Sequence, residues 1–481
     1  MEGLPAMTES FFTAARGTAL QTGSIAVPRD PLIKPEDGAA IARLVSVWRD
    51  HYPRNLIRMG FYVAHNGLKD FGISVPRSIA TRVTSCIGWP AKAVRSLADL
   101  SVFDGIDTGL DDAYGLQPLA AQLEDTLAVD EAIVSAYIYG CSFITLTADA
   151  DGRMIFTPRS AELSAATWDG VHNRLAGALT ITDATDDGEI TSYSAFLPYR
   201  SYEFIKQGSR WAVARMDTNW PTPTVVPFVS DPQLSRPLGC SRITPVVMSA
   251  TDSAFRTMVR MEASAEFYSV PKLWFLGADR GAFDENTWNN LISAINGIGA
   301  DEETGEKPTM QQVQQASMDP HTNMLKTIAM LVASDTDLPV DSLGITLTNP
   351  SSAEAMAAAE RRLTRRADRQ NRLFGARIEE LLRMAVCLRD GLTAPPADLT
   401  VKAQWMPTRE ISDAARADAY VKVAGVNPAY ATSSVGLRRL GLTGAEIEAL
   451  KADMNRQQGS DLLAALVAKG AANGDTGDNA G

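Results

Sequence analysis

Residues 349–366 read NPSSAEAMAAAERRLTRR, and this stretch decides the fold. Pro350 prevents an earlier helix start, and Ser351 followed by Glu354 forms a capping box, in which each side chain satisfies a backbone amide at the helix N-terminus. The stretch therefore predicts that a helix begins directly after the loop of residues 335–350, which contains both Pro and Gly.

The predicted helix is long. After Pro350 the first glycine is Gly375, and the next stop signal is Gly391. A helix over residues 351–390 would span roughly 60 Å, which exceeds the width of a small domain. We expect such a helix to cross an assembly or to pack against copies of itself, and Gly375 is the position at which we expect any kink.

Two faces of this helix can be distinguished. Apolar residues at spacings of three and four predict one buried stripe; they are Leu363, Ala367, Phe374, Ile378, Leu381, Leu382, Ala385 and Leu388. Basic residues cluster within about three and a half turns, namely Arg361, Arg362, Arg365, Arg366, Arg369 and Arg372. This cluster has two interpretations: a solvated face that pairs with Glu360 and Asp368, or a surface for phosphate or for a neighbouring subunit.

Composition bounds the class of protein. The chain has 481 residues, enough for two to four domains, and its 45% hydrophobic and 21% charged residues are typical of a globular protein. The formal net charge of −12 argues against a protein that coats nucleic acid, because such proteins are normally basic. An acidic protein that surrounds DNA without gripping it remains compatible with this charge.

The remaining compositional signals indicate that the protein is made and assembled in cytoplasm. The four cysteines, Cys86, Cys141, Cys240 and Cys387, are too scattered for a disulfide framework or a zinc site. Residues 1–25 lack the pattern of a signal peptide. The sequence contains no apolar segment of 18 residues, so we expect no transmembrane helix. We expect a flexible arm over residues 1–30 and a disordered tail over residues 470–481.

The order of predicted elements indicates an α+β protein. Helices are expected over 33–52, 76–100 with a break near Gly88, and 118–139. Short β-rich runs separated by turn signals then predict an antiparallel meander of successive hairpins over 142–215, and the Pro-rich residues 221–237 predict an extended connection. A helix over 241–269, a small mixed insert over 270–320 and a return helix over 321–333 follow. After the long helix we expect a strand at 399–404 and helices at 410–424, 433–440 and 443–457.

The sequence contains no convincing catalytic motif. The sequence lacks a Walker phosphate loop and a Gly-x-Ser-x-Gly elbow, and its four histidines are isolated from one another. The acidic turns at Asp149 and Asp186 lack the carboxylate spacing of a calcium loop, so hairpin turns are the better interpretation. We therefore assign no catalytic residue, no cofactor site and no metal site.

Four stretches in this order resemble the portal protein family of tailed double-stranded DNA bacteriophages. They are Tyr62 to Pro76 followed by Ile87-Gly88-Trp89-Pro90, then Ala136-Tyr137-Ile138-Tyr139-Gly140, then Gly239-Cys240-Ser241-Arg242-Ile243, and finally Asn349-Pro350-Ser351-Ser352-Ala353-Glu354-Ala355. The likeness is nearest to portals of long-tailed phages that infect actinobacteria, and it covers most of residues 35–455.

The resemblance implies a portal-like architecture. Its parts would be a wing over 31–240, a stem helix over 241–269, a clip over 270–320, a stem return helix over 321–334, a tunnel loop over 335–350, the long helix over 351–390 and a helical crown region over 391–469.

The resemblance also implies a function and partners. The chain would form a ring of typically twelve subunits at one vertex of the capsid, through which double-stranded DNA passes without sequence specificity. Its partners would be the terminase large subunit, head-completion or connector proteins, and capsid and scaffolding proteins, with no membrane involved.

Within this expected architecture we predict three groups of site residues. The tunnel loop would present Asp335, Thr336, Asp337, Asp341, Ser342, Thr346, Thr348 and Asn349 to DNA. Arg361, Arg362, Arg365 and Arg366 would join neighbouring subunits, and the clip would present Asp301, Glu302, Glu303, Glu306 and Lys307 to partners. Two other classes stay open: a DNA-processing or hydrolytic enzyme with dispersed acidic residues, and another oligomeric capsid or connector protein.

Overall fold

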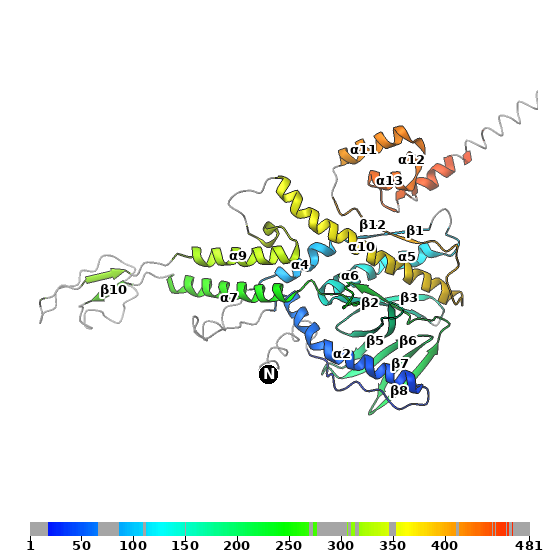
Figure 1. The fold of residues 1–481 in the computed structure, drawn as a ribbon, viewed down its shortest axis with the longest axis horizontal. Helices are drawn as coiled ribbons and strands as arrows, with labels where there is room; N and C mark the ends of the chain where they lie inside the picture. Colours follow the sequence, from blue (N-terminus) through cyan, green and yellow to red (C-terminus); the bar gives the residue numbers. More distant parts are fainter. Residues whose placement is uncertain are drawn as a thin grey trace, which may run out of the picture. The chain divides into compact units, whose positions relative to one another are not determined.

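The computed structural model describes residues 18–65, 86–108, 112–149, 151–268, 273–276, 305, 309–312, 317–345, 353–409, 413–444, 446–447, 449–457, 459–460 and 464. The chain divides into two compact units, coloured along the sequence in Figure 1. The first unit comprises Met1–Tyr62, Ala91–Ile243 and Ser351–Gly481, and the second comprises Val63–Pro90 and Thr244–Pro350. Both helices and sheets contribute, so the mixed fold class is confirmed.

The first unit contains a five-stranded antiparallel sheet in which each strand pairs with the next along the chain. Its strands are β4 (Ser164–Asp169), β5 (Arg174–Ala184), β6 (Ile190–Leu197), β7 (Arg200–Gln207) and β8 (Arg210–Asp217). Helix α2 (Pro35–Tyr62) packs on this sheet (Figure 1). Its Leu44 and Trp48 belong to the same buried core cluster as Tyr193 and Phe204. The predicted meander is therefore confirmed for these five strands.

The first two β-runs of the predicted meander belong to a different sheet. Strand β2 (Cys141–Ala148) lies between β3 (Met154–Ser160) and β9 (Val225–Val229), all antiparallel. We expected residues 221–237 to form only an extended connection, and β9 corrects this expectation. Pro227 pairs with Phe143 in this edge strand, where proline is tolerated because its missing N–H can face away from the ladder.

Helix α10 (Ala353–Arg389) packs against this smaller sheet together with α6 (Ala128–Tyr139). The Phe374 ring lies 5.6 Å from the Phe228 ring and 5.8 Å from the Tyr137 ring, measured between centroids. Of the predicted apolar stripe on α10 all members are buried except Leu388, which is half-buried. The expected long amphipathic helix is confirmed.

Gly375 serves close packing within an unbroken helix of 37 residues. A Cβ atom at Gly375 would lie 3.2 Å from Trp405 Nε1 in strand β12 (Lys402–Trp405), so the glycine lets β12 approach the helix. Strand β12 pairs with β1 (Phe103–Asp107), a strand that the sequence pattern did not predict. Helix α5 (Leu116–Asp125) packs beside β1.

Helices α11 (Asp413–Val426), α12 (Pro428–Thr432) and α13 (Ser434–Leu440) follow in the first unit. Asn427 caps α12 through its side-chain oxygen, and Ser433 caps α13 in the same way. These caps explain why the chain turns twice within a few residues. We expected α11 and α13 but not α12.

The second unit consists of two helices packed side by side, α7 (Pro245–Tyr268) and α9 (Asp319–Thr336), with the 3₁₀ turn η2 (Val340–Leu343) packed against α9. The antiparallel pair β10 (Leu273–Leu276) and β11 (Thr309–Gln312) also belongs to it. Helix α4 (Trp89–Ala98) spans the boundary between the units. No helix among the described residues is long and apolar enough to cross a membrane.

Candidate functional site

The segment that follows α9 begins later than its sequence suggests. Asp335 and Thr336 form the last turn of α9, and Asp337 ends the helix in the left-handed conformation with φ of 56°. The Leu338 amide then donates to the Ala333 carbonyl at 3.1 Å. Such a left-handed cap satisfies carbonyls that the helix leaves open. The chain therefore leaves α9 in a defined direction.

Two of the predicted channel residues make contacts within the subunit. Asp335 Oδ2 accepts a hydrogen bond from Thr244 Oγ1 at 2.6 Å, at the N-terminus of α7, where the helix dipole favours a negative charge. The Thr336 hydroxyl donates to the Val332 carbonyl at 2.6 Å, and the residue is only 2% exposed. The expectation that Thr336 offers a hydrogen-bonding group to DNA is therefore wrong for the folded subunit.

The 3₁₀ turn η2 is held by a residue that sequence reasoning did not place in the site. Trp89 Nε1 donates to the Leu343 carbonyl at 3.2 Å, and the Leu343 side chain is buried. Asp341 is exposed, Ser342 is half-buried, and the Gly344 amide donates to the Asp341 carbonyl at 2.9 Å. Trp89 belongs to one of the family-like stretches, and this membership is the sequence feature that could have indicated its role. Thr346, Thr348 and Asn349 lie outside the described residues.

The arginine cluster lies on the face of α10 opposite its buried stripe. At about 100° per residue, Arg361, Arg365, Arg369 and Arg372 fall within an arc of about 80°, and all four are exposed, as is Arg362. Arg366 is half-buried and contributes to the electrostatic surroundings of Tyr137. We call Arg361, Arg365, Arg369 and Arg372 the arginine stripe.

Neither acidic residue expected to pair with the arginine cluster, Glu360 or Asp368, forms an ion pair with the arginine stripe within the described part of the chain. Asp368 Oδ1 accepts a hydrogen bond from Thr408 Oγ1 at 2.7 Å. Glu360 is exposed, and within the part of the chain that the structure describes no ion pair joins it to the arginine stripe. Because like charges four residues apart destabilise a helix by roughly 0.2–0.5 kcal/mol per pair, an unpaired stripe calls for an external partner.

Two of the family-like stretches meet in the first unit. The Arg242 amide donates to the Tyr137 carbonyl at 2.9 Å, and Ser241 Oγ donates to the Ile138 carbonyl at 2.5 Å. Gly140, with φ of 107°, ends α6 where a Cβ atom would lie 3.3 Å from the Cys240 backbone. This junction locks the end of α6 to the chain that leads toward α7, a role that the sequence alone did not indicate.

The other predicted sites are resolved as follows. Asp149 Oδ1 accepts the amides of Asp151 and Arg153, as expected of a hairpin turn. Among the described residues no group of three or more His, Cys, Asp or Glu could hold a metal ion. The clip residues Asp301, Glu302, Glu303, Glu306 and Lys307 lie outside the described residues.

Comparison with known proteins gives consistent relatives. Residues 88–459 match the family described as phage portal protein, SPP1 Gp6-like. The portal protein of Mycobacterium phage L5 is 28% identical over 406 residues, covering 81% of this chain and 83% of that protein. The portal protein of Mycobacterium phage D29 is 28% identical over 447 residues, covering 89% and 91%.

Among solved structures, a chain from the neck of a native GTA particle, computed with C12 symmetry, is 14% identical with a TM-score of 0.40. It covers 81% of this chain and 98% of that one.

The family match extends over more than half of the chain. This protein therefore belongs to the phage portal proteins of the SPP1 Gp6-like family. The resemblance to portals of phages that infect actinobacteria is confirmed by the two mycobacteriophage relatives. Neither the family nor these relatives are described as enzymes, so the enzyme alternative gains no support.

Proposed function

We propose that this protein assembles into a homo-oligomeric ring, of typically twelve subunits, at one vertex of the phage capsid. The channel of the ring conducts double-stranded DNA during packaging and ejection. Membership of the portal family over residues 88–459 is the observation that carries this proposal. The ring is part of the virion and assembles in the host cytoplasm.

The arginine cluster of α10 supports a contact between subunits. Arg361, Arg362 and Arg365 are exposed and have no acidic partner among the described residues, on a chain whose net charge is −12. An acidic neighbouring copy supplies such partners, and a ring repeats each pair in every subunit. Exposed ion pairs contribute under about 1 kcal/mol each, so repetition is what makes the contact effective.

The segment after α9 is proposed to face DNA. Asp337 and Asp341 place negative charge near the start of this segment. Ser342, Thr346, Thr348 and Asn349 offer neutral hydrogen-bonding groups. A surface that grips DNA needs Lys or Arg, because phosphate neutralisation supplies most non-specific affinity. Changing Asp337 and Asp341 to Lys should slow packaging, measured as full-length genome per head over time, without preventing ring assembly.

The residues 270–320 are proposed to be the clip, which docks the terminase large subunit and later the head-completion proteins. Its acidic stretch from Asp301 to Glu306 is the proposed contact surface. The packaging motor's ATPase would be a separate protein, since this sequence lacks a phosphate loop. Deleting residues 298–307 should leave the subunit folded and impair motor docking.

The experiment that tests the function is the size of the purified protein. Light scattering after size exclusion should give several hundred kilodaltons, and negative-stain images should show a central hole. A stable monomer would contradict the proposal.

Replacing Arg361, Arg362, Arg365 and Arg366 with Gln should weaken the ring and lower the salt concentration at which it dissociates. A matched control changes Arg377 and Arg383, which pair with Glu380 and Glu379 in their own helix. Intact rings that lose only DNA retention would place the cluster against DNA instead of a neighbouring subunit.

A further inference from the structure

The loop between β9 and the α6 junction presents a leucine to solvent. The Gln233 amide donates to the Arg236 carbonyl at 3.1 Å, and the Arg236 amide donates back to the Gln233 carbonyl at 2.9 Å. This two-residue turn leaves Leu234 and Ser235 at its tip. Leu234 is fully exposed. A large aliphatic side chain at the tip of a turn has no contact to gain within its own subunit.

The base of this loop is pinned, so the tip has a fixed position. Gln370 of α10 donates through Nε2 to the Val229 carbonyl and accepts the Asp231 amide through Oε1, both at 3.1 Å. The Cys240 amide donates to the Ser230 carbonyl at 2.8 Å. Gly239 adopts φ of 75° where a Cβ atom would lie 2.2 Å from the Ser230 carbonyl oxygen. The loop is therefore built to hold Leu234 out from the surface.

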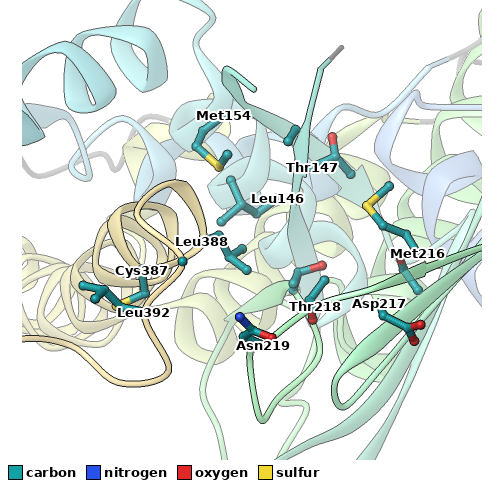
Figure 2. Close-up of a pocket in the computed structure, with 14 residues that line it drawn as sticks. Leu146, Thr147, Met154, Met216, Asp217, Thr218, Asn219, Cys387, Leu388 and Leu392 are labelled. Atoms are coloured by element: carbon teal, nitrogen blue, oxygen red, sulfur yellow. The ribbon is translucent and has the colours of Figure 1, made fainter. Parts of the chain in front are cut away.

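The same unit contains a cavity of about 280 Å³ at the C-terminal end of α10. Figure 2 shows an apolar wall, with Leu146 and Met154 near Leu388 of α10, and Met216 on the opposite side beside the polar Asp217. Thr218 also lines it, and its hydroxyl is buried without a hydrogen-bond partner among the described residues. A water occupies about 30 Å³ in the liquid, so the cavity has room for the four side-chain carbons of a leucine.

The loop and the cavity cannot meet within one subunit. Gln370, at the base of the loop, and Cys387, in the cavity wall, are separated by about 26 Å along α10 at 1.5 Å per residue. A ring is built from heterologous contacts, in which one patch of each copy fits a different patch on the next. A protruding leucine and a cavity with an apolar wall, at two places on one unit, are the two unlike patches that such a contact requires.

We propose that Leu234 of each subunit inserts into this cavity of the neighbouring subunit in the ring. The inference rests on the proposed ring and names a contact within it. The side chain covers the apolar wall formed by Leu146, Met154 and Leu388, and the turn's polar groups lie near the Thr218 hydroxyl. Burying one leucine changes a pairwise affinity by about tenfold to a hundredfold.

Disulfide trapping tests this contact. Exposed Cys86 is first changed to Ser and Cys387, which lines the cavity, to Ala. Leu234→Cys is then combined with Met216→Cys, at a cavity residue that is half-exposed to solvent. Mild oxidation with copper phenanthroline should give a ladder of covalent multimers, and neither single variant should do so. The matched control combines Met216→Cys with Val171→Cys, since Val171 is another exposed turn residue; it should give no ladder.

A second variant measures the energy of the contact. Leu234→Asp should raise the subunit concentration needed for ring assembly by at least tenfold, whereas Val171→Asp should not change it. Intact rings with neither cross-linking nor a concentration shift would overturn the leucine contact and leave the ring itself standing. A wild-type protein that forms no ring would overturn both.

Discussion

Replacing Trp89 with Phe tests whether the turn after α9 is held by a single hydrogen bond. The change removes the indole N–H that donates to the Leu343 carbonyl at 3.2 Å and keeps an aromatic ring in place. A hydrogen bond of this kind contributes about 0.5–1.5 kcal/mol net. At about 1 kcal/mol, local opening of η2 becomes about five times more frequent, because the opening equilibrium follows the local free energy.

Hydrogen exchange measured by mass spectrometry reports this opening directly. The Ser342 amide donates to the Pro339 carbonyl at 3.1 Å, and the Gly344 amide donates to the Asp341 carbonyl at 2.9 Å. A peptide containing both amides should exchange about two- to tenfold faster in Trp89→Phe, while peptides from α7 and α9 keep their rates. Trp211→Phe in β8 is the control, since Trp211 packs on Tyr193 far along the chain from η2.

An unchanged exchange rate at Ser342 and Gly344 would refute the reasoning, because it would mean that η2 is held by burial of Leu343 alone. Equal acceleration by the Trp211 control would also refute it, since the effect would then be a general loss of stability.

Three further predictions concern the stability and reactivity of the first unit. Burial, and then the charges of Asp104 and Asp125, raise the pKa of Glu124. Ionised Glu124 therefore lowers the free energy of unfolding at neutral pH. This destabilisation disappears as the pH falls through the raised pKa of the folded state toward the ordinary pKa of a glutamate. Glu124→Gln should raise the urea midpoint at pH 7 and have a smaller effect at pH 4.5. Burial raises the pKa of Cys141 to about 12, so exposed Cys86 should react with a maleimide at pH 7.5 faster than half-buried Cys141. Gly239→Ala should lower the free energy of unfolding by more than about 2 kcal/mol, because the new Cβ adds a steric clash to left-handed strain. Gly152 has φ of 78° and open space around it, so Gly152→Ala should show the strain alone. Equal losses of stability in the two variants would contradict the clash.

The elements that could be predicted from the sequence depend on interactions between near neighbours. The hairpins from β4 to β8 follow from alternating side chains and from turns such as Asp169-Gly170 and Gln207-Gly208, because each strand pairs with the next. The long helix follows from its apolar spacing and from the absence of Pro and Gly before Gly375. The order of the family-like stretches was also readable along the chain.

Only the tertiary structure decided which distant segments meet. The Pro-rich residues 221–237 predicted an extended connection, yet β9 within them is a strand, and Pro227 is accommodated because β9 lies at an edge of its sheet. Strand β1 pairs with β12 some three hundred residues later, and Trp89 reaches the Leu343 carbonyl across 254 positions.

The structure also decided which polar groups remain available for function. Asp335 and Thr336 form hydrogen bonds at helix ends, and Asp368 accepts a hydrogen bond from Thr408. The arginine stripe on α10 is exposed. The sequence determined the charge and periodicity of these segments, because both are properties of neighbouring residues. Which polar groups form hydrogen bonds within the subunit depends on packing between residues far apart in the chain. The local sequence pattern does not indicate that packing.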